Sequence, residues 1–208
     1  MPFENVKFET LALEKRTRIL NASISEFSNN EYESASMNSI VQEAKISKGS
    51  LFNYFVNKSE LYKYIYNIAV QKVKKYLKKV RDESTDLPFE ERLCLIVEKG
   101  IDFIEKNPKL SKMYFKLRFS GNSPNQNQIL NDLQKMSELY LENILKSAIF
   151  KREIDKNINI KQSVFFLDTI LNKYLNDYHR LNNTENSSHF TPEDWTSGIA
   201  SFFAKGFK

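Results

Sequence analysis

Apolar residues recur along this chain at intervals of three and four positions, the spacing that gathers side chains on one face of an α-helix. A first helix is expected over residues 10–28, where an apolar stripe is formed by Leu13, Leu20, Ile24 and Phe27. Short helices follow from Ser36 and Ser47, and longer ones are expected over 57–80, 88–106, 108–120, 124–151, 161–181 and 192–206. The pattern therefore predicts an all-α protein.

Residues that favour the first turn of a helix precede several of these segments. Three predicted N-caps stand before prolines: Asn107, Ser123 and Thr191. The best-specified start has Asn57 at the N-cap and Glu60 three positions later, a variant of the capping box. Val56 is expected to pack on Leu61 there as a hydrophobic staple.

Residues 36–61 combine two short helices with a tight turn between them. Ser36 is the predicted cap of the first helix, and Ser47 is that of the second. Lys45 and Ile46 form the turn between them. Helix-turn-helix proteins place the start of the second helix in the major groove of DNA. The pattern therefore predicts a DNA-binding module.

The residue types at the start of the second helix suit contact with DNA. Lys48 can reach a phosphate or the edge of a guanine. Gly49 costs about 1 kcal/mol in a helix relative to alanine, which makes sense where a side chain would keep the backbone from the DNA. Leu51 and Phe55 fall on the opposite face and are expected in the core. The predicted DNA contacts are Ser36, Ser47, Lys48, Gly49, Ser50, Asn53, Tyr54 and Lys58.

The net charge of +5 lies in the part of the chain that carries this module. Residues 1–80 hold 13 basic and 8 acidic residues, which accounts for the whole excess, so residues 81–208 are neutral. A basic module beside a neutral one indicates a polyanionic partner for the first alone.

The segment over about residues 10–62 resembles the DNA-binding domain of the TetR family of bacterial transcriptional repressors. The residues that carry the resemblance are Ser36, Ile40-Val41, Ala44-Lys45-Ile46-Ser47, Gly49, Phe52, Tyr54-Phe55, Lys58, Glu60 and Leu61. Three of them depart from the family pattern, because Lys45 replaces the turn glycine, Phe52 replaces a tyrosine and Val41 replaces an alanine.

The resemblance implies an N-terminal three-helix DNA-binding domain over residues 1–62 and a C-terminal helical bundle over 63–208. The helix of about 57–80 links the two. The implied function is that of a cytoplasmic bacterial regulator, a repressor released from a palindromic operator by a small-molecule effector. Such proteins are homodimers that use their last two helices as the interface.

Apolar stripes on the last two predicted helices fit that interface, although ordinary core packing is the alternative. The candidate interface residues are Leu167, Leu171, Tyr174, Tyr178, Trp195, Ile199, Phe202 and Phe203. Aromatic residues elsewhere in the C-terminal region could line a pocket for the effector. The candidate pocket residues are Phe103, Tyr114, Phe115, Arg118, Tyr140 and Phe165.

Other chemistry leaves little trace in the sequence. The lysine-rich run 71–81 could make an all-helical adaptor or a membrane-surface helix, but cations near a helix C-terminus are more simply a solvated face. Cys94, the single cysteine, is expected to be a small buried residue. His179 and His189 lack partners at metal-ligand spacing. We expect no enzyme activity, cofactor, metal site or membrane partner.

Overall fold

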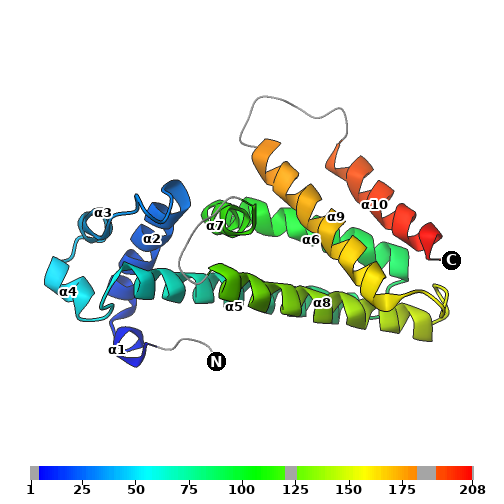
Figure 1. The fold of residues 1–208 in the computed structure, drawn as a ribbon, viewed down its shortest axis with the longest axis horizontal. Helices are drawn as coiled ribbons and strands as arrows, with labels where there is room; N and C mark the ends of the chain where they lie inside the picture. Colours follow the sequence, from blue (N-terminus) through cyan, green and yellow to red (C-terminus); the bar gives the residue numbers. More distant parts are fainter. Residues whose placement is uncertain (1–4, 120–125, 182–190, 208) are drawn as a thin grey trace. The chain divides into compact units, whose positions relative to one another are not determined.

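The computed structural model describes residues 5–119, 126–181 and 191–207, and its regular elements in these ranges are all helices (Figure 1). They are α1 (Val6–Glu9), α2 (Leu13–Asn29), α3 (Met37–Glu43), α4 (Lys48–Phe52), α5 (Lys58–Glu83), α6 (Phe89–Lys106), α7 (Pro108–Phe119), α8 (Gln126–Phe150), α9 (Ile160–Leu181) and α10 (Pro192–Gly206). The all-α prediction is confirmed. The helix α1 was not predicted, and the predicted cap Ser123 lies outside the described residues.

The chain forms two compact units. The first unit comprises Met1–Lys74 and Pro108–Leu130, and the second comprises Lys75–Asn107 and Asn131–Lys208. The helices α5 and α8 each contribute residues to both units. The predicted boundary at residue 62 separates a DNA-binding domain from a ligand-binding and dimerisation domain, and this functional boundary stays a prediction.

The first unit is built around α2, which packs against α3 and α7. Its helices bury one apolar stripe each, as expected for amphipathic helices. The largest side chains with almost no exposure in this core are Phe8, Ile19, Ile40, Leu51, Phe55, Leu61, Ile65, Met113 and Leu117. Leu13, predicted to belong to the stripe of α2, is the first residue of that helix and is instead 69% exposed.

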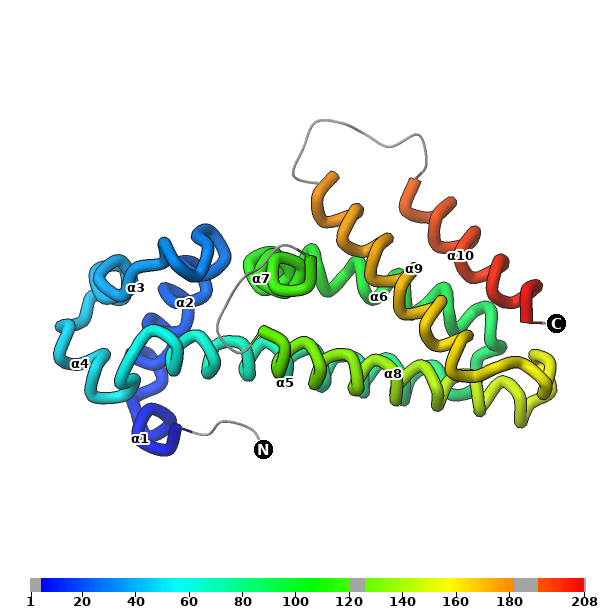
Figure 2. Tube along the Cα trace, in the orientation of Figure 1, coloured from blue at the N-terminus to red at the C-terminus, as the bar shows by residue number. Residues whose placement is uncertain are grey.

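The second unit is centred on α6, against which α9 and α10 pack (Figure 2). One apolar cluster joins side chains from α5, α6, α8, α9 and α10, including Val80, Leu93, Ile144, Leu167 and Phe203. Thr191 caps α10 as predicted, and a capping box with Asp194 reinforces this start.

Two predicted local features differ in the structure. The Asn57–Glu60 box forms only in part. Asn57 Oδ1 accepts from the Glu60 N–H at 2.9 Å, but the Glu60 carboxylate accepts from the N–H of Val56, at 2.7 Å, instead of that of Asn57. Val56 itself is 74% exposed, so it does not staple onto the buried Leu61. Asn107 turns back to donate to the Phe103 carbonyl at 3.0 Å, so it ends α6 instead of starting α7.

Candidate nucleic-acid interface

The helices α3 and α4 form the predicted pair of short helices, and one face of α4 is open to solvent. Lys48, Gly49 and Asn53 are exposed there, and Ser50 is half-buried. On the opposite face Leu51 is fully buried in the first unit. The structure therefore places the predicted base-facing residues together on one surface.

Nothing inside the protein explains the glycine in this helix. A Cβ atom built on Gly49 would have no neighbour within 4 Å, and the residue does not have a positive φ. Alanine would fit here and would favour the helix. The packing of the protein therefore leaves the backbone at Gly49 open to close approach from outside, and its contact with DNA stays a prediction.

The two serines that cap these helices each keep a hydroxyl proton to donate. Ser36 Oγ accepts from the Ser39 N–H at 3.4 Å, and Ser47 Oγ accepts from the Ser50 N–H at 3.1 Å. A serine hydroxyl can accept and donate at the same time. Ser47 is exposed and Ser36 is half-buried, so their O–H groups can still donate to a phosphate oxygen.

The turn between α3 and α4 has a left-handed residue that is not glycine. Lys45 has a φ of 52°. Its N–H donates to the Gln42 carbonyl at 3.1 Å, and the Ile46 N–H donates to the Val41 carbonyl at 3.2 Å. This is the Schellman pattern, which usually has glycine at the left-handed position. Lysine thus keeps the turn that the family pattern builds with glycine, at a backbone cost of about 1–2 kcal/mol.

Lys58 has a different environment from the one that a direct phosphate contact requires. Its half-buried ammonium group donates to the carbonyls of Tyr32 at 2.7 Å, Glu33 at 3.0 Å and Ala35 at 3.0 Å. It also lies 4.6 Å from the centre of the Tyr32 ring. A lysine ammonium has three N–H donors, and all three are used here. The structure therefore makes Lys58 a residue that holds the loop before α3, and its predicted phosphate contact is not supported.

A second lysine holds the same loop from another helix. Lys116 of α7 donates to the Asn30 carbonyl at 2.8 Å and to the Phe27 carbonyl at 3.4 Å. A cation near the last carbonyls of α2 also complements that helix's dipole. Together Lys116 and Lys58 fix the backbone of the α2–α3 connection.

Tyr54, two residues after the end of α4, is supported by α1, the helix that the sequence pattern did not predict. Phe8 of α1 is completely buried, and its ring lies 5.8 Å from the Tyr54 ring and 5.0 Å from the Phe55 ring. Asn5 Nδ2 donates to the Tyr54 carbonyl at 2.6 Å. Four-residue helices are too short for a periodic pattern, so α1 could be found only from the Asn5 cap and a lone aromatic.

The six candidate pocket residues are divided between the two units. Tyr114, Phe115 and Arg118 belong to the first unit, whereas Phe103, Tyr140 and Phe165 belong to the second. Phe103 packs on Tyr76 with ring centres 5.2 Å apart, and the Tyr140 hydroxyl is buried. The side chain of Phe165 is 64% exposed, so it does not line an enclosed pocket. A shared pocket stays a prediction.

The candidate interface residues on α9 and α10 divide into core and surface. Leu167, Leu171, Ile199 and Phe203 are buried inside the second unit, so for these four the alternative of ordinary core packing is the one observed. Tyr174 and Tyr178 are half-buried. Trp195 and Phe202 are 43% and 66% exposed, respectively.

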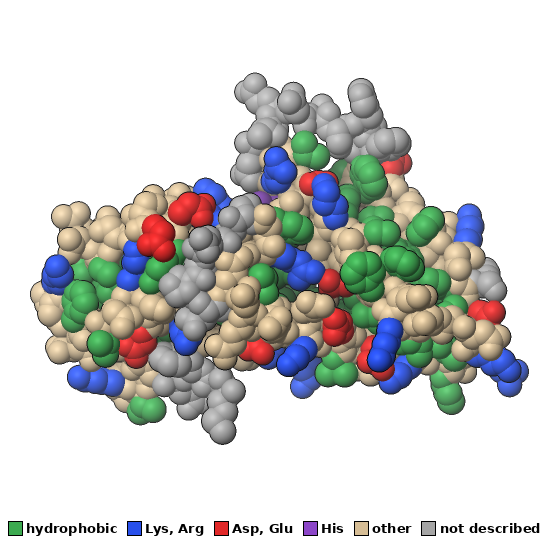
Figure 3. Space-filling view, in the orientation of Figure 1, with side chains coloured by type: hydrophobic (Ala, Val, Ile, Leu, Met, Phe, Trp, Pro, Cys, Tyr) green, Lys and Arg blue, Asp and Glu red, His purple; other side chains and the backbone are tan. Residues whose placement is uncertain are grey.

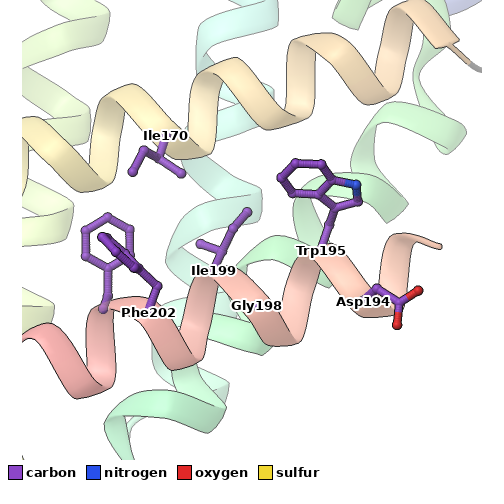
Figure 4. A pocket seen from close by; sticks show the side chains of 7 residues that line it. Ile170, Asp194, Trp195, Gly198, Ile199 and Phe202 are labelled. Atoms are coloured by element: carbon purple, nitrogen blue, oxygen red, sulfur yellow. The ribbon is translucent and has the colours of Figure 1, made fainter. Parts of the chain in front are cut away.

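A groove lies between α9 and α10, with Ile170 on one side and Trp195, Gly198 and Phe202 on the other (Figure 4). Hydrophobic side chains gather over this part of the second unit in the space-filling view (Figure 3). Gly198 has open space where a Cβ would stand, so another surface can approach α10 closely at this point.

Other reactive groups are few. Burial raises the pKa of the half-buried Cys94 thiol, which keeps it protonated and weakly reactive. Within the described ranges, no cluster of histidine, cysteine and acidic residues could hold a metal ion. His189, considered above as a metal ligand, lies outside these ranges. None of the described helices has the length and apolar character needed to cross a membrane.

Comparisons with known proteins find relatives of part of the first unit by sequence and similar folds for almost the whole chain. Residues 19–65 match the family of bacterial regulatory proteins, tetR family. The HTH-type transcriptional regulator UidR of Escherichia coli strain K12 is 37% identical over 81 residues, which cover 39% of this chain and 40% of UidR. The matched part is thus less than half of that relative's length.

Solved structures with a similar fold extend over almost the whole chain. FadR from Bacillus subtilis, solved in complex with stearoyl-CoA, has a TM-score of 0.73 at 15% identity, with 92% of this chain and 99% of that chain covered. Salmonella enterica GusR has a TM-score of 0.72 at 20% identity, with 95% and 97% covered. Over residues 19–65, this chain is thus similar to the tetR family of bacterial regulatory proteins.

Proposed function

We propose that the chain is a sequence-specific DNA-binding transcriptional regulator that acts as a homodimer and responds to a small-molecule effector. The observation that carries this proposal is the exposed face of α4, which presents Lys48, Gly49 and Asn53 together. The packing of the protein does not require a glycine at position 49. That face belongs to the segment that matches the tetR family. A regulator of this kind works in the cytoplasm, where bacterial DNA is found.

Within this proposal, Lys48 and Asn53 contact base edges, and the hydroxyls of Ser36 and Ser47 hold phosphates. Gly49 allows the close approach. Lys58 acts through the loop that it holds, and Tyr54 presents its hydroxyl from a ring fixed by α1. Binding of an effector in the second unit lowers affinity for the operator, to the extent that the effector prefers the non-binding conformation. The regulator proposed here is a repressor, so release from the operator allows transcription.

The second copy of the chain is the proposed occupant of the groove between α9 and α10. One recognition helix rarely provides enough specific affinity alone, and helix-turn-helix dimers read two half-sites about one helical turn apart. The exposed Trp195 and Phe202 offer an apolar surface, and Gly198 permits close contact. Sedimentation at increasing protein concentration tests this, since a monomer at all concentrations would refute it.

Selection of duplexes from a random library tests the proposed function. The purified protein is used at about 0.15 M salt, where non-specific attraction to phosphates is moderated. We expect an inverted repeat whose half-sites are about 10 base pairs apart. Lys48→Ala should weaken binding to that repeat by about 1–3 kcal/mol. Recovery of no preferred sequence by protein free of small molecules would refute the proposal.

A membrane-surface function for residues 71–81 is not favoured. The lysines at 72, 74, 75, 78 and 79 are exposed, but the apolar side of the same helix is already used inside the protein. Val80 is 2% exposed and belongs to the core of the second unit. A membrane-surface helix needs a free apolar face to enter the lipid.

A further inference from the structure

Arg92 of α6 is a buried cation that has no partner among the residues that the structure describes. Only 6% of its surface is exposed, and it forms no hydrogen bond or ion pair with any residue that the structure describes. Its Nε–H is completely enclosed. Burial lowers the pKa of the guanidinium, although an arginine stays charged in any protein environment. Buried charges are normally paired, so an unpaired one calls for a reason.

A second unpaired donor lies near it on another helix. The hydroxyl of Tyr140 on α8 is buried without a hydrogen-bond partner among the described residues. Tyr140 packs against the apolar cluster that contains Val80 and Leu93, and Leu93 directly follows Arg92. Burial raises the pKa of Tyr140 to about 12, while the charge of Arg92 acts on it in the opposite direction. The phenol is therefore a neutral donor within electrostatic reach of the guanidinium.

The charges around this pair do not neutralise Arg92. Glu153 attracts it but lies beyond ion-pair distance, and Arg81 repels it. Arg81 has its own partner, because its guanidinium binds Asp82 at 2.8 Å. All of these residues belong to the second unit. The site thus combines a fork of N–H donors with a phenolic O–H, and it contains no bound acceptor from the described chain.

We propose that Arg92 and Tyr140 bind the anionic group of an organic acid, a carboxylate or a phosphate monoester, whose apolar body packs against the core of the second unit. A planar guanidinium matches both groups with parallel hydrogen bonds, and the phenol supplies one more. Tyr140 packs against an apolar cluster that contains Val80, Leu93 and Ile144, so we infer that the rest of the ligand is apolar as well. The identification of this ligand as the effector rests on the proposed function, whereas its binding does not.

Three probes of equal chain length separate the ligand classes. Sodium decanoate, decyl phosphate and 1-decanol are titrated into the full-length protein, and both calorimetric affinity and thermal midpoint are measured. We expect at least one of the two anions to bind about tenfold or more tightly than the alcohol. A preference for one anion identifies the head group. Equal affinity for all three probes would overturn the proposal.

Variants of the two residues locate the binding. Arg92→Met should remove the preference for the anion and leave binding of 1-decanol unchanged, and Tyr140→Phe should reduce the preference in part. Arg152→Met is the matched control, because Arg152 is an exposed arginine of the same unit and should leave the preference intact. A preference that persists in Arg92→Met would place the anion elsewhere.

The stability of the free protein gives a readout that a purely structural arginine would not share. Because Arg92 is buried without a partner, Arg92→Met should keep or raise the thermal midpoint without ligand. A clear fall in that midpoint would show a structural role and overturn the proposal. Failure to recover a preferred duplex would refute the proposed regulator and leave the anion binding in place, so the two can fail separately.

Discussion

Gly49→Ala should make the protein more stable and a weaker DNA binder. The new Cβ would meet nothing within 4 Å inside the protein, so it adds no steric cost to the folded state. It removes the flexibility of a glycine from α4, which is worth about 0.5–1 kcal/mol. For a chain of this length, that is a rise in the thermal midpoint of about 1–4 °C.

The effect on DNA binding should have the opposite sign. If the backbone at Gly49 lies against the DNA, a methyl group there displaces α4 from its contacts, at a cost of about 1–3 kcal/mol. Each 1.4 kcal/mol corresponds to about a tenfold loss of affinity. Thermal unfolding and titration of a labelled operator duplex measure the two effects on the same preparation.

Gly206→Ala is the matched control, because Gly206 ends α10 and also has open space for a Cβ. It should leave DNA affinity unchanged. If Gly49→Ala binds the operator as tightly as the original protein, the glycine is not there for DNA and the reasoning fails. If it instead lowers the thermal midpoint, the assignment of open space around Gly49 is wrong.

Three other substitutions test separate parts of the argument. Lys58→Met should lower the free energy of unfolding by about 1–3 kcal/mol and should weaken operator binding. The salt dependence of that binding should not change. A smaller slope of affinity against salt would instead indicate a lost phosphate contact. Lys45→Gly should raise the free energy of unfolding by about 0.5–1 kcal/mol, because relief of the left-handed strain exceeds the entropy cost of glycine. An equal gain in Lys45→Ala would show that backbone strain is not the cause. Phe202→Asp should shift sedimentation from dimer to monomer, while the control Phe150→Asp, at an even more exposed phenylalanine, should not. A dimer that survives Phe202→Asp would refute the proposed interface.

Local sequence rules were sufficient for most of the helices. The caps Ser36, Ser47 and Thr191 form as predicted, because the side chain that stabilises each first turn is within three residues of the N–H it accepts from. The apolar periodicity located the long helices because it, too, depends only on residues close together in the sequence. The Lys45 turn also kept its conformation, since the two Schellman hydrogen bonds do not depend on the side chain.

Contacts between distant residues were the part that the sequence could not reveal. The three carbonyls that Lys58 binds lie 23 to 26 residues before it, so nothing in the local pattern distinguishes it from a surface lysine. Apolar stripes could not tell the buried Leu167 from the exposed Phe202, because both fit a helical period. The helix α1 was not predicted because its four residues make little more than one helical turn, too few for a periodic pattern to show.

The different surroundings of the two lysines at this surface have a consequence for chemical labelling. Lys48 is exposed, and its ammonium lies over the face of the Phe52 ring, at 5.9 Å from the ring centre. The Lys58 ammonium is held by three carbonyls. An amine-reactive reagent should therefore modify Lys48 quickly and Lys58 slowly in the free protein. Only the modification of Lys48 should slow when DNA is added, so Lys58 reports on the intact fold in the same sample.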